Sequence, residues 1–145
     1  MNAPYSKLTL AQAQQIISQA LAAATTAAYK PMAVAVLDDA GHLVAFARQD
    51  GASMFRFDIA VAKAWGAVGM GAPSRVLGER AQGNPNFFLS LAATSQGRFL
   101  PQTGAVLIKD HAGHVLGAAG ASGGTGDEDE AICQAGIAAT GLVVG

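Results

Sequence analysis

The sequence predicts an α+β fold, in which helices pack against an antiparallel sheet. Two observations lead to this prediction. Residues 33–53 align without a gap on residues 105–125, a shift of 72 positions, and eight of the 21 aligned positions are identical. Each copy reads as a strand, a glycine turn, a second strand and a glycine loop, and a helical pattern follows. We therefore expect two hairpin-plus-helix units that share one sheet.

The first half of the chain predicts a helix, a hairpin and a second helix. Ser6 or Thr9 is expected to cap the first helix, which runs to about Tyr29, and Pro31 prevents its continuation. The next segments are apolar, and Asp and Gly residues between them suit a tight turn. The expected elements are strands at Ala33–Leu37 and Leu43–Ala47, a turn at Asp38–Gly41, and a helix from about Ser53 to Gly69. Alanine and glycine are so frequent in this helix that another backbone is expected to pack closely on it, as at a subunit interface.

The second half contains an insert and then the second unit. Residues 71–104 have no counterpart in the repeat, and prolines divide them into short helices near Ser74–Ala81 and Asn86–Thr94. This insert is either a cover for a binding pocket or a plain connection. The second hairpin is expected at Ala105–Ile108 and Val115–Ala121, and the last helix from about Gly126 through Leu142 to the end.

Composition narrows the class of protein. A length of 145 residues predicts one domain, residues 1–145. The chain is 51% hydrophobic but only 13% charged, so little polar surface is left for a monomer and a homo-oligomer is expected. A net charge of −1 without a basic stripe argues against nucleic acid and anionic membranes as partners.

The expected location and the state of the cysteine follow from features that the sequence lacks. No apolar run reaches the roughly 18 residues of a membrane span, and the first residues lack the pattern of a signal peptide. A cytoplasmic location is therefore expected. The single cysteine, Cys133, excludes an internal disulfide, and its place in the helical pattern predicts a buried thiol.

Several motifs resemble one protein family along nearly the whole chain. They are VAVLDDAGHLVAF, RQDGA, DIAVAKAW and GAAGASGGTGDEDEA, in that order. Together they resemble the GlcG/HbpS-like family, which includes the C-terminal domain of PduO proteins. The resemblance implies a profilin-like fold with a five-stranded antiparallel sheet flanked by helices. It also implies a dimer, tetramer or octamer. Members bind haem or respond to it, and others lie among catabolic genes.

The sequence departs from this family at two places. Haem-coordinating members of the PduO kind have a histidine near the first helix, whereas residues 9–30 contain none. In the segment that leads into the second hairpin, residues 102–106, only Gly104 matches the family pattern. If haem binds, the candidate ligands are the histidines His42, His111 and His114, all at predicted turns. The apolar slot would come from Met54, Phe55, Phe57, Phe87, Phe88 and Phe99, which could equally belong to the core.

The alternative to a haem-binding protein is a small cofactor-free enzyme. The family resemblance places Lys63 in a cleft, with Glu130 or Asp129 as its expected partner. Arg48 and Asp50 stand at a strand end, where a guanidinium can hold a carboxylate. Lys63, Glu130 and Arg48 would then be catalytic, in tautomerisation or imine hydrolysis on a small keto or unsaturated acid. A third option is an accessory subunit that binds a protein partner.

One set of residues is expected to contact a small ligand, whichever function applies. The acids at 127–130 oppose a phosphate on the glycine loop before them, so the loop is interpreted as a strand-to-helix turn that caps the helix. The family resemblance implies that this loop borders a cleft at the subunit interface. The histidines lack the spacing of a helical metal site, and no metal other than haem iron is expected. The predicted ligand-binding residues are Arg48, Asp50, Asp58, Lys63, Gly104, Ser122, Thr125 and Glu130.

Overall fold

The structure is a computed structural model and describes residues 6–145. It contains five helices and five strands. The helices are α1 (Leu10–Thr26), α2 (Phe55–Met70), α3 (Ser74–Gly83), α4 (Pro85–Thr94) and α5 (Gly126–Ala139). The strands are β1 (Ala33–Asp38), β2 (Leu43–Arg48), β3 (Ala105–Lys109), β4 (Val115–Ser122) and β5 (Val143–Val144). The predicted α+β class is confirmed.

All five strands form one antiparallel sheet in the order β2-β1-β4-β3-β5. The two hairpins therefore lie side by side, joined by β1 and β4, as the repeat predicts. Even their irregularities correspond, because the register shifts between Val36 and Leu37 and again between Ile108 and Lys109. The second hairpin lies at the centre of the sheet, whereas β2 of the first hairpin is an edge strand.

Both hairpin turns are held by an aspartate side chain. Asp38 Oδ1 accepts hydrogen bonds from the backbone N–H groups of Ala40 and His42, each at 2.9 Å. Asp110 repeats this arrangement with the two equivalent residues of the second turn. The turn glycine that follows has a positive φ in both hairpins (+82° and +89°), which an L side chain adopts only with strain.

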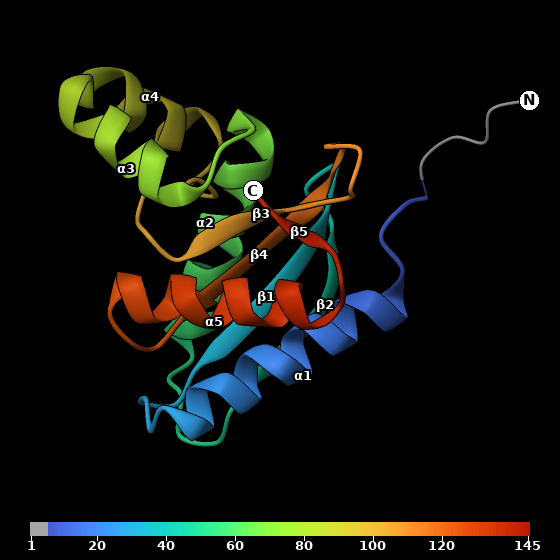
Figure 1. Cartoon of the computed structure of the whole chain (residues 1–145). Coiled ribbons are helices and arrows are strands. Elements are labelled where there is room, and N and C mark those ends of the chain that lie inside the picture. The colour runs from blue at the N-terminus through green and yellow to red at the C-terminus, as the bar shows by residue number, and fades with distance from the viewer. Residues whose placement is uncertain (1–5) are drawn as a thin grey trace, which may run out of the picture.

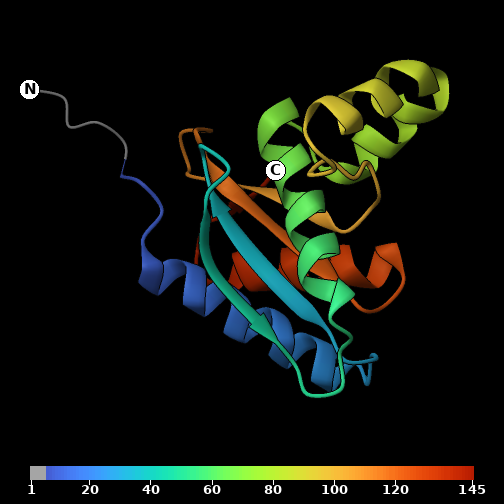
Figure 2. The same cartoon turned by 180° about the vertical axis from the view of Figure 1, so that it is seen from behind.

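Helices cover both faces of the sheet. Figures 1 and 2 show α1 and α5 packed side by side on one face and α2 on the other. Side chains alternate along β1, so Val34 and Val36 belong to the core beneath α1 and α5, while Leu37 packs with α2. The helices that follow the two hairpins thus lie on opposite faces.

The small residues of α2 are explained by contact within the chain. A Cβ on Gly120 of β4 would lie 2.4 Å from the Ala60 carbonyl oxygen and 3.0 Å from the Cβ of Ala64. Gly66 of α2 lies beneath the ring of Phe99. The close backbone predicted from the composition is therefore that of β4, and the small residues need no subunit interface.

The insert forms an arm beside the sheet. In Figures 1 and 2, α3 and α4 project from the body of the molecule near α2. Leu77, Phe88 and Phe99 form a small core of their own within this arm. Only the segment after the helices, around Leu100 to Thr103, reaches the cavity described below.

One predicted element end was confirmed and one was wrong. Thr9, not Ser6, caps α1, because its side chain accepts from the N–H of Gln12 while the Gln12 side chain accepts from the N–H of Thr9. The last helix ends at Ala139 rather than at the end of the chain. Gly141 takes a φ of +79°, which stops the helix, and β5 then pairs with β3.

Among residues 6–145, no helix combines the length and the hydropathy needed to cross a bilayer. Cys133 is fully buried, as predicted, and burial raises the pKa of its thiol, with the nearby Asp129 carboxylate acting in the same direction. Its sulphur is therefore a packing atom rather than a nucleophile.

Candidate functional site

A cavity of about 520 Å³ lies where β4 ends. One wall is the N-terminal half of α2, a second is the segment that leads into β3, and the third is the glycine loop with the first turn of α5. The lining residues are Arg56, Ile59, Lys63, Leu100, Gln102, Thr103, Ser122, Gly124, Thr125, Gly126, Asp127 and Asp129. Lys63, Ser122 and Thr125 were predicted from the sequence.

A buried ion pair forms one wall of the cavity. The Lys63 ammonium lies 2.9 Å from Asp129 Oδ2 and also donates to the Ala121 carbonyl oxygen at 3.2 Å. Asp129 Oδ1 accepts from the Gly124 N–H at 2.9 Å. The side chains are 6% and 2% exposed, respectively. Burial raises the pKa of Asp129, although the charge of Lys63 and the hydrogen bonds oppose the shift.

Gly104 provides the space that Lys63 occupies. Its φ is +142°, and a Cβ there would lie 2.6 Å from Lys63 Nζ and 3.1 Å from the Ala121 carbonyl oxygen. Gly104 is not among the residues that line the cavity, and its lack of a side chain allows Lys63 to reach Asp129.

Arg56 was missed by the sequence analysis. Its Nη1 donates to Ser122 Oγ at 2.9 Å, and its side chain is half-buried at the cavity wall. Within residues 6–145, no carboxylate lies at ion-pair distance from this guanidinium. Arg56 precedes Lys63 by seven residues, or two helical turns, so both project from the same face of α2. That spacing was the signal in the sequence.

Glu130 does not pair with Lys63, so its predicted role as the partner is wrong. The carboxylate of Glu130 accepts from Arg75 Nε at 3.2 Å, and Asp127 binds the same guanidinium. Hydrogen bonds from Arg75 to Glu130 and Asp127 raise the pKa of Arg75. Residue 130 lies one position past the residue that faces the cavity, about 100° around the helix. Asp129, the other partner considered, takes this place.

Thr125 lines the cavity but is also the cap of α5. Its Oγ1 accepts from the Glu128 N–H, and the Glu128 carboxylate accepts from the Thr125 N–H. This is a complete capping box, and it satisfies two of the free N–H groups at the start of α5. The interpretation of the loop as a helix cap that borders a cleft agrees with this geometry.

Arg48, Asp50 and Asp58 do not line the cavity. Arg48 pairs with Ala33, which in turn pairs with Ser122, so Arg48 stands two strands, or about 10 Å, from the cavity wall. Asp58 lines a separate hollow with Trp65 and Arg98. The predicted grouping of Arg48, Lys63 and Glu130 is therefore not formed.

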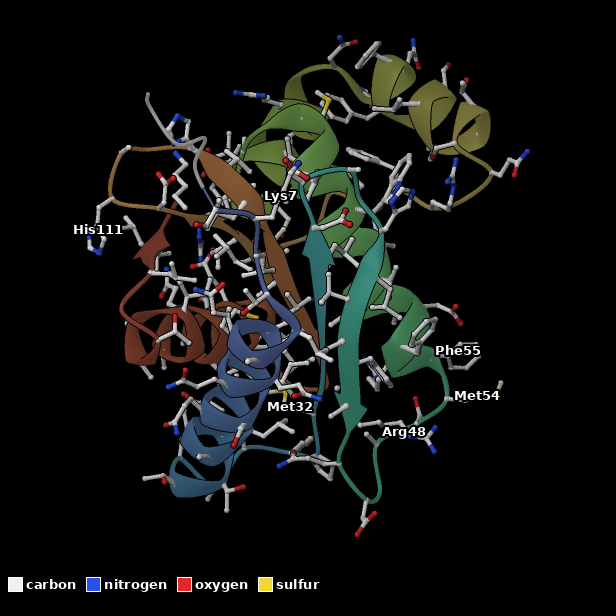
Figure 3. All side chains as sticks on the ribbon, turned by 90° about the vertical axis from the view of Figure 1, so that its right-hand side faces the viewer. Lys7, Met32, Arg48, Met54, Phe55 and His111 are labelled. Carbon is white, nitrogen blue, oxygen red and sulfur yellow. The ribbon has the colours of Figure 1, made fainter. Side chains whose placement is uncertain are left out.

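Arg48 belongs instead to an exposed corner where β2 leads into α2. Met54 is 70% exposed, Phe55 58% and Phe57 38%. In Figure 3, Arg48, Met54 and Phe55 lie on this side of the molecule, and Met54 and Phe55 point away from the ribbon. The ring of Phe57 packs edge-on against Phe46 of β2, with 4.8 Å between the ring centroids. We call Arg48, Met54, Phe55 and Phe57 the α2 corner.

The three histidines lie at the hairpin turns, at the other end of the sheet from the cavity. The eight residues of β4, which separate His114 from the cavity, span roughly 25 Å. His114 Nδ1 lies 2.9 Å from Asp110, and His111 Nε2 lies 2.9 Å from the Gly141 carbonyl oxygen. Figure 3 shows His111 pointing outward. The His42 side chain is 80% exposed, against 50% for His114, and its Nδ1 lies 3.8 Å from Asp38. Within residues 6–145, no cluster of three or more acidic, His or Cys side chains is suited to a metal ion.

Comparison with known proteins identifies the family. The profile of the family described as "Haem degrading protein HbpS-like" matches residues 8–138. The chain belongs to the HbpS-like family. The resemblance stated from the sequence motifs is thereby confirmed, although a search among curated proteins gives no match.

Solved structures of HbpS-like relatives share the fold over nearly their whole length. The PduOC–haem complex is 25% identical, with a TM-score of 0.85 over 95% of this chain and 98% of that chain. A double mutant of Streptomyces reticuli HbpS is 28% identical, with a TM-score of 0.80 over 95% and 90%. The Klebsiella pneumoniae protein ORFY is 26% identical, with a TM-score of 0.85 over 99% and 98%.

Proposed function

We propose that this HbpS-like protein binds a small ligand, and that this ligand is haem or a related tetrapyrrole. The observation that carries the proposal is the match to the PduOC–haem complex, which extends over nearly all of both chains. The family description, which names haem, points in the same direction.

Haem needs an apolar surface for the macrocycle, a donor for the iron and a cation near the propionates. The cavity does not fit these needs, since its walls are largely polar and hold no His, Met, Cys or Tyr side chain. The α2 corner fits them better. Phe55 and Phe57 offer ring surface, Met54 offers a thioether that is 70% exposed, and Arg48 offers a guanidinium.

We assign the α2 corner as the haem contact, with Met54 as the iron donor and Arg48 for a propionate. Bound haem would supply an iron centre that can change oxidation state or ligand. The protein's own part is to cover one face of the macrocycle and to hold its charged edge. The histidines are the competing donors, and the His42 side chain is 80% exposed.

Titration with hemin tests both the function and the site. We expect a Soret shift that saturates at about one haem per subunit. Met54→Ala should change the ligation spectrum, and Phe55→Ala should weaken binding. The triple substitution His42→Ala, His111→Ala and His114→Ala should leave the spectrum unchanged. Absence of any Soret shift rejects haem binding. A shift lost only in the triple variant rejects the α2 corner in favour of the turns.

Self-association is part of the same proposal. The arm exposes Phe87 (50%) and Leu89 (71%), and β2 exposes Leu43 (47%). Together with a charged fraction of 13%, these side chains support a homo-oligomer. Light scattering after size exclusion should give a mass of two or more subunits, and Leu89→Asp should lower it if the arm is the contact. A monomer at micromolar concentration contradicts the proposal.

A second candidate function is cofactor-free acid–base chemistry in the cavity. The observation that favours it is the buried Lys63–Asp129 pair at the cavity wall, because burial raises the pKa of Asp129 and so makes its carboxylate a stronger proton acceptor. Tautomerisation of a small keto acid would need only proton transfer, from carbon to Asp129 and then to the enolate oxygen, with Lys63 beside that oxygen, and return of the proton to carbon would give exchange. Exchange of the C3 protons of 2-oxobutyrate in D₂O, followed by NMR, measures this step. Asp129→Asn should abolish the exchange, whereas a rate equal to that without protein rejects the activity.

A further inference from the structure

The two cations on the cavity walls differ in their partners. Two cations, Arg56 and Lys63, and two acids, Asp127 and Asp129, line the space. Asp129 is matched by Lys63, and Asp127 is matched by Arg75 from outside the cavity. This leaves Arg56 without an acidic partner within residues 6–145. The guanidinium of Arg56 is therefore the cationic group on the cavity wall that a ligand can pair with.

The guanidinium of Arg56 also has donors to spare. It carries five N–H groups in a planar fork, and the hydrogen bond given for it goes to Ser122 Oγ at 2.9 Å. That bond fixes the position of one end of the fork at the cavity wall. A carboxylate accepts two parallel hydrogen bonds from such a fork, which makes it the matching group for Arg56.

The rest of the wall limits the charge and the size of the ligand. Asp127 and Asp129 would repel a second carboxylate or a phosphate. Ile59 and Leu100 provide apolar surface, and Gln102 and Thr103 provide hydrogen-bonding groups. A volume of about 520 Å³ suits a small molecule of this kind.

We propose that the cavity is a binding site for a small monocarboxylate, held through its carboxylate by Arg56. This inference is independent of haem binding at the α2 corner. It specifies the substrate class for the second candidate function, on whose cavity it rests, but binding does not require that proton transfer occurs there.

The test is a titration of the full chain with 2-oxobutyrate, followed by protein NMR shifts and by calorimetry. We expect saturable binding with a Kd of about millimolar or tighter. Methyl 2-oxobutyrate, which lacks the charge, and 2-oxoglutarate, which has a second carboxylate, should each bind at least about tenfold more weakly. Arg56→Gln should weaken binding of 2-oxobutyrate by about tenfold or more, and Arg56→Lys by less.

Arg80→Gln is the matched control, because Arg80 is an exposed arginine on α3 that does not line the cavity. It should bind 2-oxobutyrate like the unchanged protein. If Arg56→Gln does not fold, Arg56→Lys decides in its place, with a measurable loss expected. Equal affinity in the Arg56 variant that folds, equal affinity for the methyl ester, or no saturable binding by the unchanged protein overturns the proposal. Binding without C3 proton exchange upholds the site and rejects only the second candidate function.

Discussion

The first hairpin lies at the edge of the sheet and the second at its centre, although equivalent residues make their turns. The strands differ accordingly. Gly120 in central β4 corresponds to Arg48 in edge strand β2, and Ala118 corresponds to Phe46. Helices pack on both faces of β4, and a Cβ at Gly120 would meet the Ala60 carbonyl oxygen of α2, whereas β2 holds the larger Phe46 and Arg48. Location in the sheet, rather than the hairpin pattern, therefore sets side-chain size.

The helices that follow the hairpins also differ in how they begin. Thr125 and Glu128 cap α5, while α2 begins at Met54 without a side-chain cap. The polar side chains at the start of α5 are thus used in hydrogen bonds to its backbone, whereas the start of α2 exposes apolar side chains. The start of α5 borders the cavity, whereas the start of α2 forms the α2 corner, which we propose as the haem contact.

The largest effect on stability is expected at the Lys63–Asp129 ion pair, which joins α2 of the first unit to α5 of the second. Lys63 and Asp129 have no charged counterpart in the repeat, since the equivalent positions hold Ala135 and Phe57. Lys63→Met leaves a buried carboxylate alone, which should cost roughly 3–5 kcal/mol of the free energy of unfolding. Adding Asp129→Leu should recover most of this loss. Denaturant unfolding measures both, and a single variant as stable as the unchanged protein contradicts the role of the pair.

A matched pair of substitutions tests the contrast between central and edge strands. Gly120→Val should destabilise the protein by about 3 kcal/mol, because its Cβ would lie 2.4 Å from the Ala60 carbonyl oxygen. Arg48→Val, at the equivalent edge position, should change stability by less than about 0.5 kcal/mol. Thermal and denaturant unfolding provide the comparison. Similar losses in both variants would show that location in the sheet is not the cause.

The difference between the helix starts can be tested in the same way. Thr125→Ala removes a hydrogen bond of the capping box and should cost about 1 kcal/mol. Ser53, the equivalent residue in the first unit, makes no side-chain cap for α2, so Ser53→Ala should have almost no effect. Equal changes in denaturation midpoint for the two variants would refute the asymmetry.

The smallest effect is expected at the turns, as a dependence of stability on pH. Desolvation raises the pKa of Asp110, but hydrogen bonds from the His114 ring and from the His114 and Ala112 N–H groups outweigh it, so this pKa lies below its usual range. Because the folded pKa is lower than the unfolded value, the contribution is present above about pH 4 and is lost as the pH falls through the folded pKa. Asp110→Asn should flatten the acid limb of the stability curve. An unchanged acid limb would remove Asp110 as its cause.

Sequence reasoning predicted the elements well because their causes are local. The Asp38 and Asp110 turns, the stop before Pro31 and the insert with two short helices each follow from residues within a few positions. The site was predicted only in part. Lys63, Ser122 and Thr125 were placed at the cavity, but Arg56 was overlooked. The sequence left Glu130 and Asp129 open as partners of Lys63, and the structure shows Asp129. Choosing between adjacent acids requires the rotation of α5 against α2, which no local pattern contains.

The sequence by itself determined the two hairpins, their turns and the helical segments, because hydrogen bonds and backbone preferences over a few residues suffice for these. Only the tertiary structure decided which hairpin takes the centre of the sheet, which face each helix covers and that the chain ends in β5. It also decided that Lys63 meets Asp129, 66 residues away. Two similar repeats favour the same local structure equally. Burial against the other elements then gives each copy its own surroundings.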